Sequence, residues 1–280
     1  MKEDKIMFSK KCFVNVCIVI LTALLATGCL FTTPIAVTGV ALDQTTMTLT
    51  AGGATGTLVA TVAPADVTNK SVTWSSSAPA VATVANGVVT PLTAGTTIIT
   101  VTTVDGDFTA TCAVTVNQAV AVGESYGGGI VAYILVDGDT GYDSGEQHGL
   151  IAATEDQSVG IMWALPAYQS TPVGGTDTLL GTGSANTDNI IVQNGGGSTY
   201  AAGLARAYNG GSYTDWFLPS KDELNKLYIN KVAIGGFFDN SYWSSSESNA
   251  NYAWFQYFYN GYQFNYVKYY TYRVRAVRAF

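Results

Sequence analysis

The chain has 280 residues, 48% of them hydrophobic, which is enough for two domains with real cores and excludes a disordered protein. Only 12% of the residues are charged and the net charge is −7, so a basic surface for nucleic acid is excluded and no nucleic-acid partner is expected. A single histidine leaves little material for acid–base catalysis, whereas 30 glycines and 17 tyrosines favour a loop-rich β protein displayed outside the cell.

The first residues have the pattern of an export signal. Lysines dominate residues 1–11, an apolar run follows over residues 12–25, and small residues precede Cys29. A membrane-spanning helix needs about 20 apolar residues, whereas a signal peptide combines a basic start, a short apolar run and a small-residue cleavage site. We therefore predict a signal peptide over residues 1–28.

The cleavage region Ala26-Thr27-Gly28-Cys29 resembles the lipobox of bacterial lipoproteins. The resemblance implies that Cys29 is lipidated, that residues 29–35 form a linker, and that an acyl anchor holds the protein in the outer membrane of the cell envelope, exposed at the surface. Ordinary secretion or an uncleaved anchor is the alternative. In the mature lipoprotein Cys112 would be the one unmodified cysteine, which excludes an intramolecular disulfide and a cysteine-based zinc site.

Residues 36–117 are rich in Thr, Val and Ala and alternate in polarity, as in Leu58-Val59-Ala60-Thr61-Val62. Period-two alternation between Gly, Pro, Asn and Asp turns predicts a β-sandwich with one buried face per sheet. On this pattern Cys112 points into the core, where a thiol is expected to be inert.

The same segment resembles the group 2 bacterial immunoglobulin-like domain over nearly its whole length. The resemblance implies that Trp74 is the core aromatic between the two sheets. It also implies a stalk, because related domains mostly act as spacers or adhesive modules. The matching residues are Val40-Ala41-Leu42, Ala63-Pro64-Ala65-Asp66-Val67-Thr68-Asn69, Val72-Thr73-Trp74-Ser75-Ser76-Ser77, Val81-Ala82-Thr83-Val84 and Ala94-Gly95-Thr96-Thr97-Ile98-Ile99.

After a linker over residues 118–124, the pattern changes to glycine-rich turns and longer loops. Ser220 followed three residues later by Glu223 predicts a helix that starts with a capping box, in which each side chain satisfies the other residue's backbone N–H. Apolar residues from Leu224 onward then share one helical face. A second, weaker helix is expected over residues 200–208.

Residues 125–280 resemble the C-terminal domain of bacterial collagen-like adhesins, a family with an α+β, C-type-lectin-like fold related to the formylglycine-generating enzymes. The enzyme branch of that fold uses cysteine chemistry, and residues 125–280 contain no cysteine, so the resemblance implies a ligand-binding domain rather than an enzyme. The matching residues are Tyr126-Gly127-Gly128-Gly129-Ile130-Val131, Gln147-His148-Gly149-Leu150-Ile151-Ala152-Ala153, Asp215-Trp216-Phe217-Leu218-Pro219-Ser220, Glu223-Leu224, Tyr242-Trp243-Ser244-Ser245-Ser246-Glu247, Ala253-Trp254 and Arg273-Val274-Arg275-Ala276-Val277-Arg278.

One glycine-rich loop carries a cluster of acidic residues. Asp137, Asp139, Asp143 and Glu146 offer oxygen ligands of the kind that Ca²⁺ prefers. Their spacing fits no EF-hand, because Gly141 would stand at the fifth position of the loop. A solvated acidic turn is therefore favoured over a calcium site, and no other cofactor is expected.

The remaining candidates for chemistry have structural explanations. His148 is the single histidine, so neither a Ser-His-Asp triad nor a His-based metal site has a second candidate, and a structural hydrogen bond is expected. Trp163, Trp216 and Trp243 are expected in the core. No catalytic residue and no metal ligand are predicted.

The tyrosines are concentrated near the C-terminus. Between Tyr252 and Tyr272, 12 of 21 residues are aromatic, and eight of these are tyrosines. Successive strand residues point to opposite faces, and aromatic residues between Phe255 and Phe264 occupy both, so one face must look outward. If about six rings are half exposed, the patch is on the order of 450–750 Å², a size that marks an interaction site. Tyrosine suits binding because it offers a large area, few rotatable bonds and a hydroxyl.

A second pattern runs through the same segment. Residues that match the family framework, such as Ala253, Gly261 and Lys268, are interleaved with large residues where the family commonly has Asn or small polar residues. Tyr, Phe and Val codons are reachable from the Asn codon AAC by changes at adenines alone, whereas Ala, Trp and Gly can use codons without adenine.

This interleaving resembles the variable region of a diversity-generating retroelement protein, over about residues 249–272. A fixed ligand face or a trimer interface is the alternative. The resemblance implies ligand-binding residues at Tyr252, Phe255, Tyr257, Tyr259, Tyr262, Phe264, Tyr266, Val267, Tyr269, Tyr270 and Tyr272.

We therefore predict a lipid-anchored surface protein, without enzymatic activity, whose β-sandwich stalk carries a C-type-lectin-like head with a diversified binding face. The expected partner is a protein or glycan on another cell, a host or a phage. A fixed-specificity glycan-binding adhesin is the second interpretation, since flat rings stack on sugars, although an acidic chain suits polyanionic glycans poorly. A structural surface-layer protein is the third.

Overall fold

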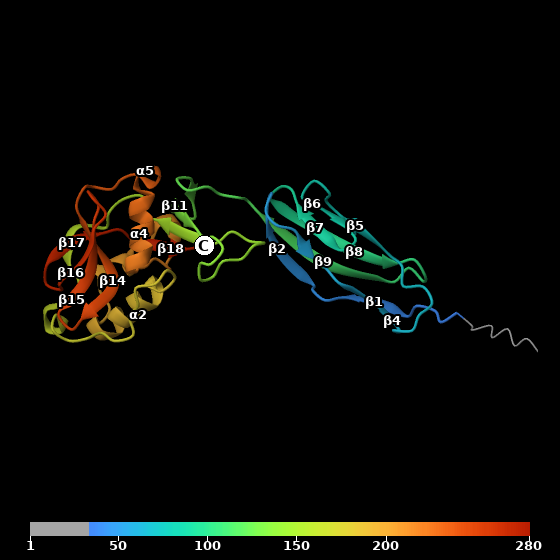
Figure 1. Ribbon diagram of the computed structural model, residues 1–280, viewed down its shortest axis with the longest axis horizontal. Helices are drawn as coiled ribbons and strands as arrows, with labels where there is room; N and C mark the ends of the chain where they lie inside the picture. Colours follow the sequence, from blue (N-terminus) through green and yellow to red (C-terminus); the bar gives the residue numbers. More distant parts are fainter. Residues whose placement is uncertain (1–33) are drawn as a thin grey trace, which may run out of the picture.

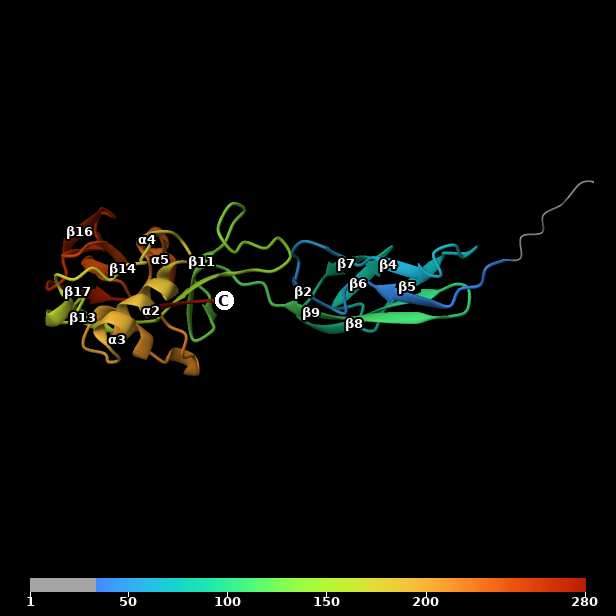
Figure 2. The ribbon, with the colours of Figure 1, turned by 90° about the horizontal axis from the view of Figure 1, so that it is seen from below.

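A computed structural model describes residues 34–280, so the predicted signal peptide and Cys29 lie outside the described residues. Figures 1 and 2 show two domains in line, with residue 34 near one end of the molecule and strands β15, β16 and β17 near the other. The C-terminus lies near the junction of the two domains. In the part of the chain that the structure describes, no helix is long and apolar enough to cross a membrane.

The N-terminal domain is the β-sandwich that the alternating pattern predicts. Its sheets have the strand orders β2-β9-β8-β5 and β3-β7-β6, and a two-stranded ribbon β1-β4 continues one end. The strands are β1 (Gly39–Leu42), β2 (Thr46–Thr50), β3 (Gly56–Thr57), β4 (Ala60–Ala63), β5 (Val72–Ser76), β6 (Ala82–Ala85), β7 (Val88–Pro91), β8 (Gly95–Thr103) and β9 (Thr109–Asn117).

The core of this domain lies between the two sheets. Cys112 is fully buried there, beside Leu49, Val89 and Ile99, and burial raises the pKa of its thiol, as expected of an inert core cysteine. Trp74 differs from its expected position, because it packs against this core half-buried at the edge of the sandwich instead of filling its centre.

Residues 125–280 form the C-terminal domain, which we call the head. It has two mainly antiparallel sheets with helices packed against them. One sheet has the order β10-β11-β12-β18 and the other the order β13-β17-β14-β15-β16. The strands are β10 (Ser125–Tyr126), β11 (Gly129–Ile134), β12 (Gly149–Ala152), β13 (Ser158–Met162), β14 (Ser241–Asn249), β15 (Tyr252–Tyr257), β16 (Gln263–Val267), β17 (Thr271–Val274) and β18 (Val277–Ala279). The helices are α2 (Gly183–Asn194), α3 (Ala201–Ala207), α4 (Lys221–Ile229) and α5 (Lys231–Ile234), with 3₁₀ turns at Pro166–Tyr168 and Gly210–Ser212.

Both predicted helices are present. Helix α4 starts with the full capping box: the Ser220 hydroxyl accepts from the Glu223 N–H, and the Glu223 carboxylate accepts from the Ser220 N–H. Helix α3 occupies the weaker segment. Trp163, Trp216 and Trp243 are fully buried, which confirms the expected core tryptophans.

The loop between β11 and β12 joins the two domains. The Gly145 carbonyl accepts from the Thr50 N–H at 2.8 Å, the Gln147 N–H donates to the Thr50 hydroxyl at 2.8 Å, and the Asn117 amide donates to the Glu146 carboxylate at 2.8 Å. These bonds link the last residues of β2 and β9 to the head, so the loop braces the head against the stalk.

The same loop carries the acidic residues of the candidate calcium site. Asp139 accepts from the Tyr133 hydroxyl and the Val136 N–H, and Asp143 accepts from the Gly145 N–H. Within residues 34–280, no group of three or more His, Cys, Asp or Glu side chains is placed to hold a metal ion. The expectation of a solvated acidic turn stays a prediction, and Glu146 takes part in the contact between the domains through Asn117.

Candidate binding face

Strands β15 and β16 form the hairpin that carries most of the predicted binding residues. Their antiparallel register pairs Ala253 with Tyr266 and Phe255 with Phe264. Because paired residues share a face, these side chains lie on one side of the sheet together with that of Tyr257.

The opposite side of the hairpin is occupied by helix α4. The Gln263 amide donates to the Lys221 carbonyl at 2.7 Å, the Gln256 amide donates to the Asn225 side chain at 2.8 Å, and the Lys221 ammonium lies 4.3 Å from the centre of the Trp254 ring. Helix α4 therefore covers one face of the hairpin, whereas the other face combines the buried Ala253 and Phe255 with exposed rings such as Phe264.

Eight of the eleven predicted residues form one connected set of rings, which we call the aromatic face. Centroid distances between neighbouring rings run from 4.5 to 6.4 Å, within the range of favourable aromatic contacts. Its members are Phe255, Tyr257, Tyr259, Tyr262, Phe264, Tyr266, Tyr270 and Tyr272.

Exposure divides the aromatic face into an outer and an inner layer. Tyr262 is 64% exposed, Tyr259 59% and Phe264 50%, whereas Phe255 is only 3% exposed. The expectation of an exposed Phe255 is corrected, because rings from two other strands, Trp243 in β14 and Tyr272 in β17, pack beside it. Phe255 supports the outer rings from beneath.

The other three predicted residues lie outside this set. Tyr252 and Val267 are paired with each other at the end of the hairpin, on the side of Trp254. Tyr269 is 61% exposed in the turn that follows β16, with no ring among the described residues close enough to join it to the cluster. They extend the predicted surface without joining the aromatic face.

The outer rings border a shallow hollow of about 420 Å³. Asn260 and Asn265 complete its lining, which otherwise consists of rings of the aromatic face, and no charged residue contributes to it. Asn265 is paired with Trp254, so its side chain lies on the side of the hairpin opposite the aromatic face. The hollow can therefore bind a neutral surface through aromatic contact and through hydrogen bonds with tyrosine hydroxyls. The lining contains no Asp, Glu, His, Lys, Ser or Cys that could act as a general acid, a general base or a nucleophile.

Below the face, Lys268 holds the segment to the core. Its ammonium contacts the Glu247 carboxylate at 2.5 Å and donates to the Thr171 carbonyl at 3.0 Å, with the Lys268 side chain fully buried and that of Glu247 8% exposed. The half-buried Val267 and the exposed Tyr269 thus flank a fixed backbone position.

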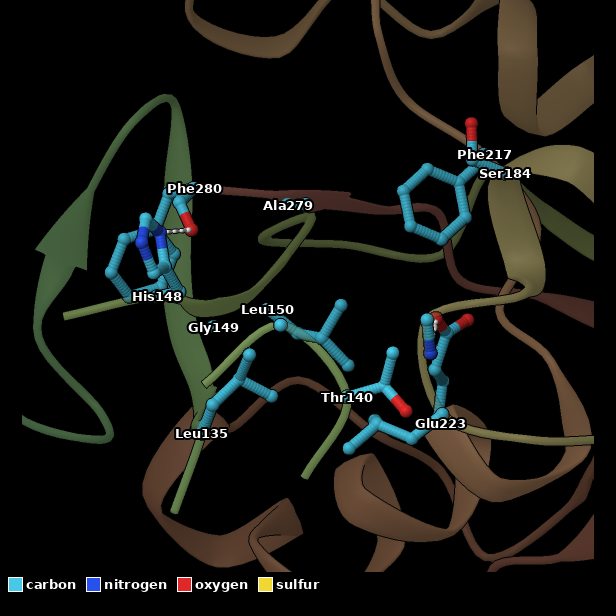
Figure 3. A pocket seen from close by; sticks show the side chains of 13 residues that line it. Leu135, Thr140, His148, Gly149, Leu150, Ser184, Phe217, Glu223, Ala279 and Phe280 are labelled. Atoms are coloured by element: carbon cyan, nitrogen blue, oxygen red, sulfur yellow. Dashed lines mark hydrogen bonds between the residues drawn. The ribbon is translucent and has the colours of Figure 1, made fainter. Parts of the chain in front are cut away.

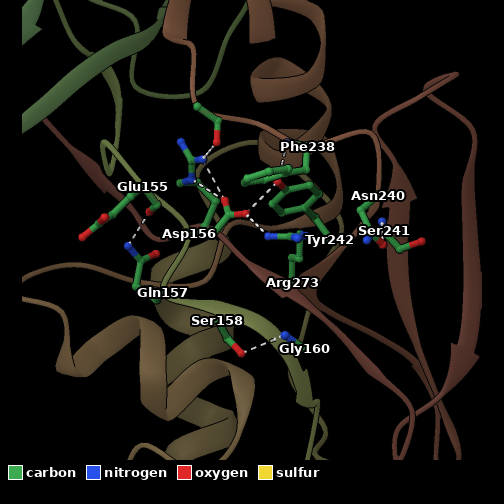
Figure 4. Close-up of polar contacts among 12 residues, drawn as sticks. Glu155, Asp156, Gln157, Ser158, Gly160, Phe238, Asn240, Ser241, Tyr242 and Arg273 are labelled. Atoms are coloured by element: carbon green, nitrogen blue, oxygen red, sulfur yellow. Dashed lines mark hydrogen bonds and ion pairs between the residues drawn. The ribbon is translucent and has the colours of Figure 1, made fainter.

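A second buried ion cluster fixes the strand that follows (Figure 4). Asp156 accepts from Arg273 at 2.9 Å, from Arg275 at 2.7 Å and from the Tyr242 hydroxyl at 2.9 Å. Burial, and secondarily the Asp156 carboxylate, raises the pKa of Tyr242, so its hydroxyl stays a donor. Sequence reasoning found neither this cluster nor the Lys268–Glu247 pair.

The residues assigned to the family framework are buried or sterically required. Ala253, Phe258 and Lys268 are fully buried. Gly261 has φ +83°, and a Cβ there would lie 2.3 Å from the Tyr228 ring, so only glycine fits. Trp254 is half-buried beneath Lys221.

A second cavity, of about 270 Å³, lies between the start of strand β12, the C-terminal residues Ala279 and Phe280, and Glu223 of helix α4 (Figure 3). Leu150, Phe217 and Phe280 give it apolar walls. The Glu223 carboxylate at its edge is committed to the backbone N–H groups of Ser220 and Gly181, and burial raises its pKa. His148 makes the expected structural contact there, with its Nδ1 3.3 Å from the Phe280 carbonyl.

Comparison with known protein families finds one match in each domain. Residues 152–278 match the Lcl C-terminal domain, and residues 36–114 match the bacterial Ig-like domain of group 2. The chain thus carries a bacterial Ig-like domain followed by an Lcl C-terminal domain, as the two sequence resemblances predict.

Individual relatives share only part of their length with this chain. It is 51% identical over 85 residues to an Ig-like virion protein of Serratia phage KSP90, covering 30% of this chain and 33% of that protein. It is 53% identical over 66 residues to an uncharacterized protein of Clostridium acetobutylicum, covering 23% of this chain and 17% of that protein.

Among solved structures, a fimbrial protein from Bacteroides ovatus is similar at 13% identity and a TM-score of 0.40, covering 87% of this chain and 71% of that one.

Proposed function

We propose that this protein is a lipid-anchored surface protein that binds a ligand through the aromatic face of a C-type-lectin-like head, and that this face is diversified by a retroelement. One observation carries the proposal: most framework residues of the segment are buried, whereas its variable positions, with the exception of Phe255, are half-buried or exposed. Ala253, Phe258 and Lys268 are fully buried, whereas Tyr262 and Phe264, at variable positions, are at least half exposed. Side chains at the exposed positions can change without loss of the core, which is the requirement for diversification.

The arrangement of the domains supports a role at the cell surface. The aromatic face lies near one end of the molecule, and residue 34, which leads toward Cys29, lies near the other (Figures 1 and 2). An anchor at Cys29 would place the face away from the membrane. The Ig-like domain would act as the spacer, and the loop contact at Thr50 and Glu146 would keep the head in line with it.

The lipid anchor is tested by removing the cysteine. Cys29→Ala is expected to abolish acylation and to move the processed protein from the detergent-rich phase to the aqueous phase of a detergent partition assay, because the thiol that would carry the acyl chain is gone. Cys112→Ala is the matched control and is expected to partition as the unchanged protein does. A Cys29→Ala protein that stays with the membrane would contradict the anchor.

Diversification is tested by sequencing the DNA around the gene. We expect a reverse transcriptase gene and a near-copy of codons 249–272 that differs from the gene at adenines alone. The codons of Ala253 and Gly261 are expected to be identical in the two copies. A complete contig without these elements would leave a fixed binding protein, with a neutral glycan as the second candidate ligand.

A further inference from the structure

Strand β16 is the last strand of its sheet, and β15 is the one strand it pairs with in residues 34–280. Figure 2 shows it at the outside of the head. An edge strand presents a row of backbone N–H and C=O groups to whatever lies beside it. The identity of the groups that face outward follows from the hydrogen bonds of the hairpin.

Two hydrogen bonds, one near each end of the hairpin, show which backbone groups of β16 bond to β15 and which face outward. The Tyr257 N–H donates to the Tyr262 carbonyl at 2.9 Å, and the Lys268 N–H donates to the Asn251 carbonyl at 3.0 Å. Hydrogen-bonded pairs alternate with non-bonded pairs along an antiparallel ladder. The bonded positions of β16 are therefore Phe264 and Tyr266, and the backbone of Asn265 points away from β15.

The neighbouring positions of β16 follow the same rule, so the N–H groups of Gln263 and Val267 also face outward. The Val267 carbonyl is taken by the N–H of Tyr270. The outward row consists of the N–H and C=O of Gln263, the N–H and C=O of Asn265 and the N–H of Val267. An added strand would present C=O and N–H groups at the same spacing and could pair with this row.

This edge lacks the usual protection against pairing. Proteins protect edges with charges, prolines or bulges, and the sequence Gln-Phe-Asn-Tyr-Val of β16 has none of them. The opposite edge of the same sheet, β13, contains Gly160, and its pairing shifts register between Ser158 and Ile161. Of the two edges, β16 alone keeps an unbroken register with its partner over its whole length.

We propose that the edge of β16 binds an extended peptide segment of another protein as an added strand, and that the hollow beside it takes every second side chain of that peptide. This inference rests on the proposed function and names the class of its ligand. Backbone hydrogen bonds do not depend on the side chains of residues 263–267. They would supply constant affinity while the aromatic face changes and sets specificity.

The charges favour a foreign peptide over a second copy of this chain. The full sequence has a net charge of −7, and removal of residues 1–28 takes away four lysines, Glu3 and Asp4, so each mature copy is more acidic still and two copies repel each other. The hollow beside β16 carries no charge to offset that repulsion. A neutral peptide meets no such barrier.

The test replaces the outward N–H of Asn265. Asn265→Pro removes this donor at an edge position where proline is tolerated, and leaves the bonds of Phe264 and Tyr266 to β15 in place. Asn265→Ser is the matched control, because it changes the side chain and keeps the N–H. Near-UV circular dichroism of the full chain checks that both variants fold.

The probe is an array of random uncharged dodecapeptides, and the strongest binder is measured in solution by fluorescence anisotropy. We expect Asn265→Pro to weaken binding about tenfold or more, and Asn265→Ser to bind as the unchanged chain does. N-methylation of single amides of the peptide is expected to weaken binding at every second position.

Three results would overturn the inference. The folded Asn265→Pro variant binds the peptide as tightly as Asn265→Ser; the array yields no binder while a glycan array does; or the unchanged chain is dimeric and Asn265→Pro is monomeric. A variant with Tyr262, Phe264 and Tyr266 changed to Ser separates the two proposals. Should it lose peptide binding that Asn265→Pro retains, the aromatic face binds and the edge does not.

Discussion

Lys268→Met is expected to destabilise the head by about 3–5 kcal/mol, because it leaves the Glu247 carboxylate buried without its cation. The carboxylate keeps one hydrogen bond, from the Val173 N–H at 2.9 Å, which does not neutralise its charge. The ammonium also lies 5.0 Å from the centre of the Trp163 ring, so its loss removes a favourable contact with the core as well. Urea unfolding of the full chain measures the effect.

The double variant Lys268→Met with Glu247→Gln separates the charge effect from packing. Removing both charges is often far less costly than removing one, so we expect the double variant to recover much of the lost stability. The unfolding transition of the Ig-like domain serves as the internal reference and is expected not to move. A single variant as stable as the unchanged protein would show that the buried pair contributes nothing to holding the segment.

Asp156→Asn is expected to cost the head a similar amount, about 3–5 kcal/mol, because two guanidinium groups would lose their one carboxylate partner. Arg275 is fully buried, and its remaining bonds go to backbone carbonyls such as that of Ala153 at 3.0 Å. Arg273 stacks on Phe238, with its guanidinium 4.1 Å from the ring centre. Neither contact replaces the negative charge.

Glu155→Gln is the control for Asp156→Asn. Glu155 is the exposed neighbour of Asp156, and its side chain forms no ion pair with the described residues, so a change within about 0.5 kcal/mol is expected. The urea midpoint of the head transition is measured for both variants. Equal midpoints for Asp156→Asn and Glu155→Gln would contradict the role assigned to the cluster.

Local signals in the sequence were sufficient for some elements of the head and insufficient for others. Helix α4 was predictable because the capping box needs only Ser220 and Glu223, three residues apart. Helix α2 was missed because it buries polar residues. Asn186 bonds with the backbone of Asp177, and the Asn194 side chain accepts from the Leu165 N–H at 2.8 Å. Such a helix lacks an apolar stripe, and its partners are distant in the sequence.

The candidate binding face likewise has some features with a local signal in the sequence and others without one. The concentration of tyrosines and the framework spacing placed the site in the C-terminal hairpin, and the alternation of β strands predicted an outward face. Alternation could not show that Phe255 is covered, because the covering rings come from Trp243 and Tyr272 on other strands. The partner of Lys268 lies 21 residues away and that of Arg275 119 residues away, so neither ion pair has a local signature.

The central claim is that the aromatic face binds the ligand, and one binding measurement tests it most directly. The full chain is applied to an array of glycans, peptides and surface proteins, beside the variant with Tyr262, Phe264 and Tyr266 changed to Ser. The control variant changes three exposed residues elsewhere, Val192, Ile229 and Val232, to Ser. Truncating several central aromatic anchors typically removes most of the binding energy, so a loss of about 100-fold or more is expected for the face variant and none for the control. A folded face variant that binds the same features as tightly as the unchanged chain would contradict the claim.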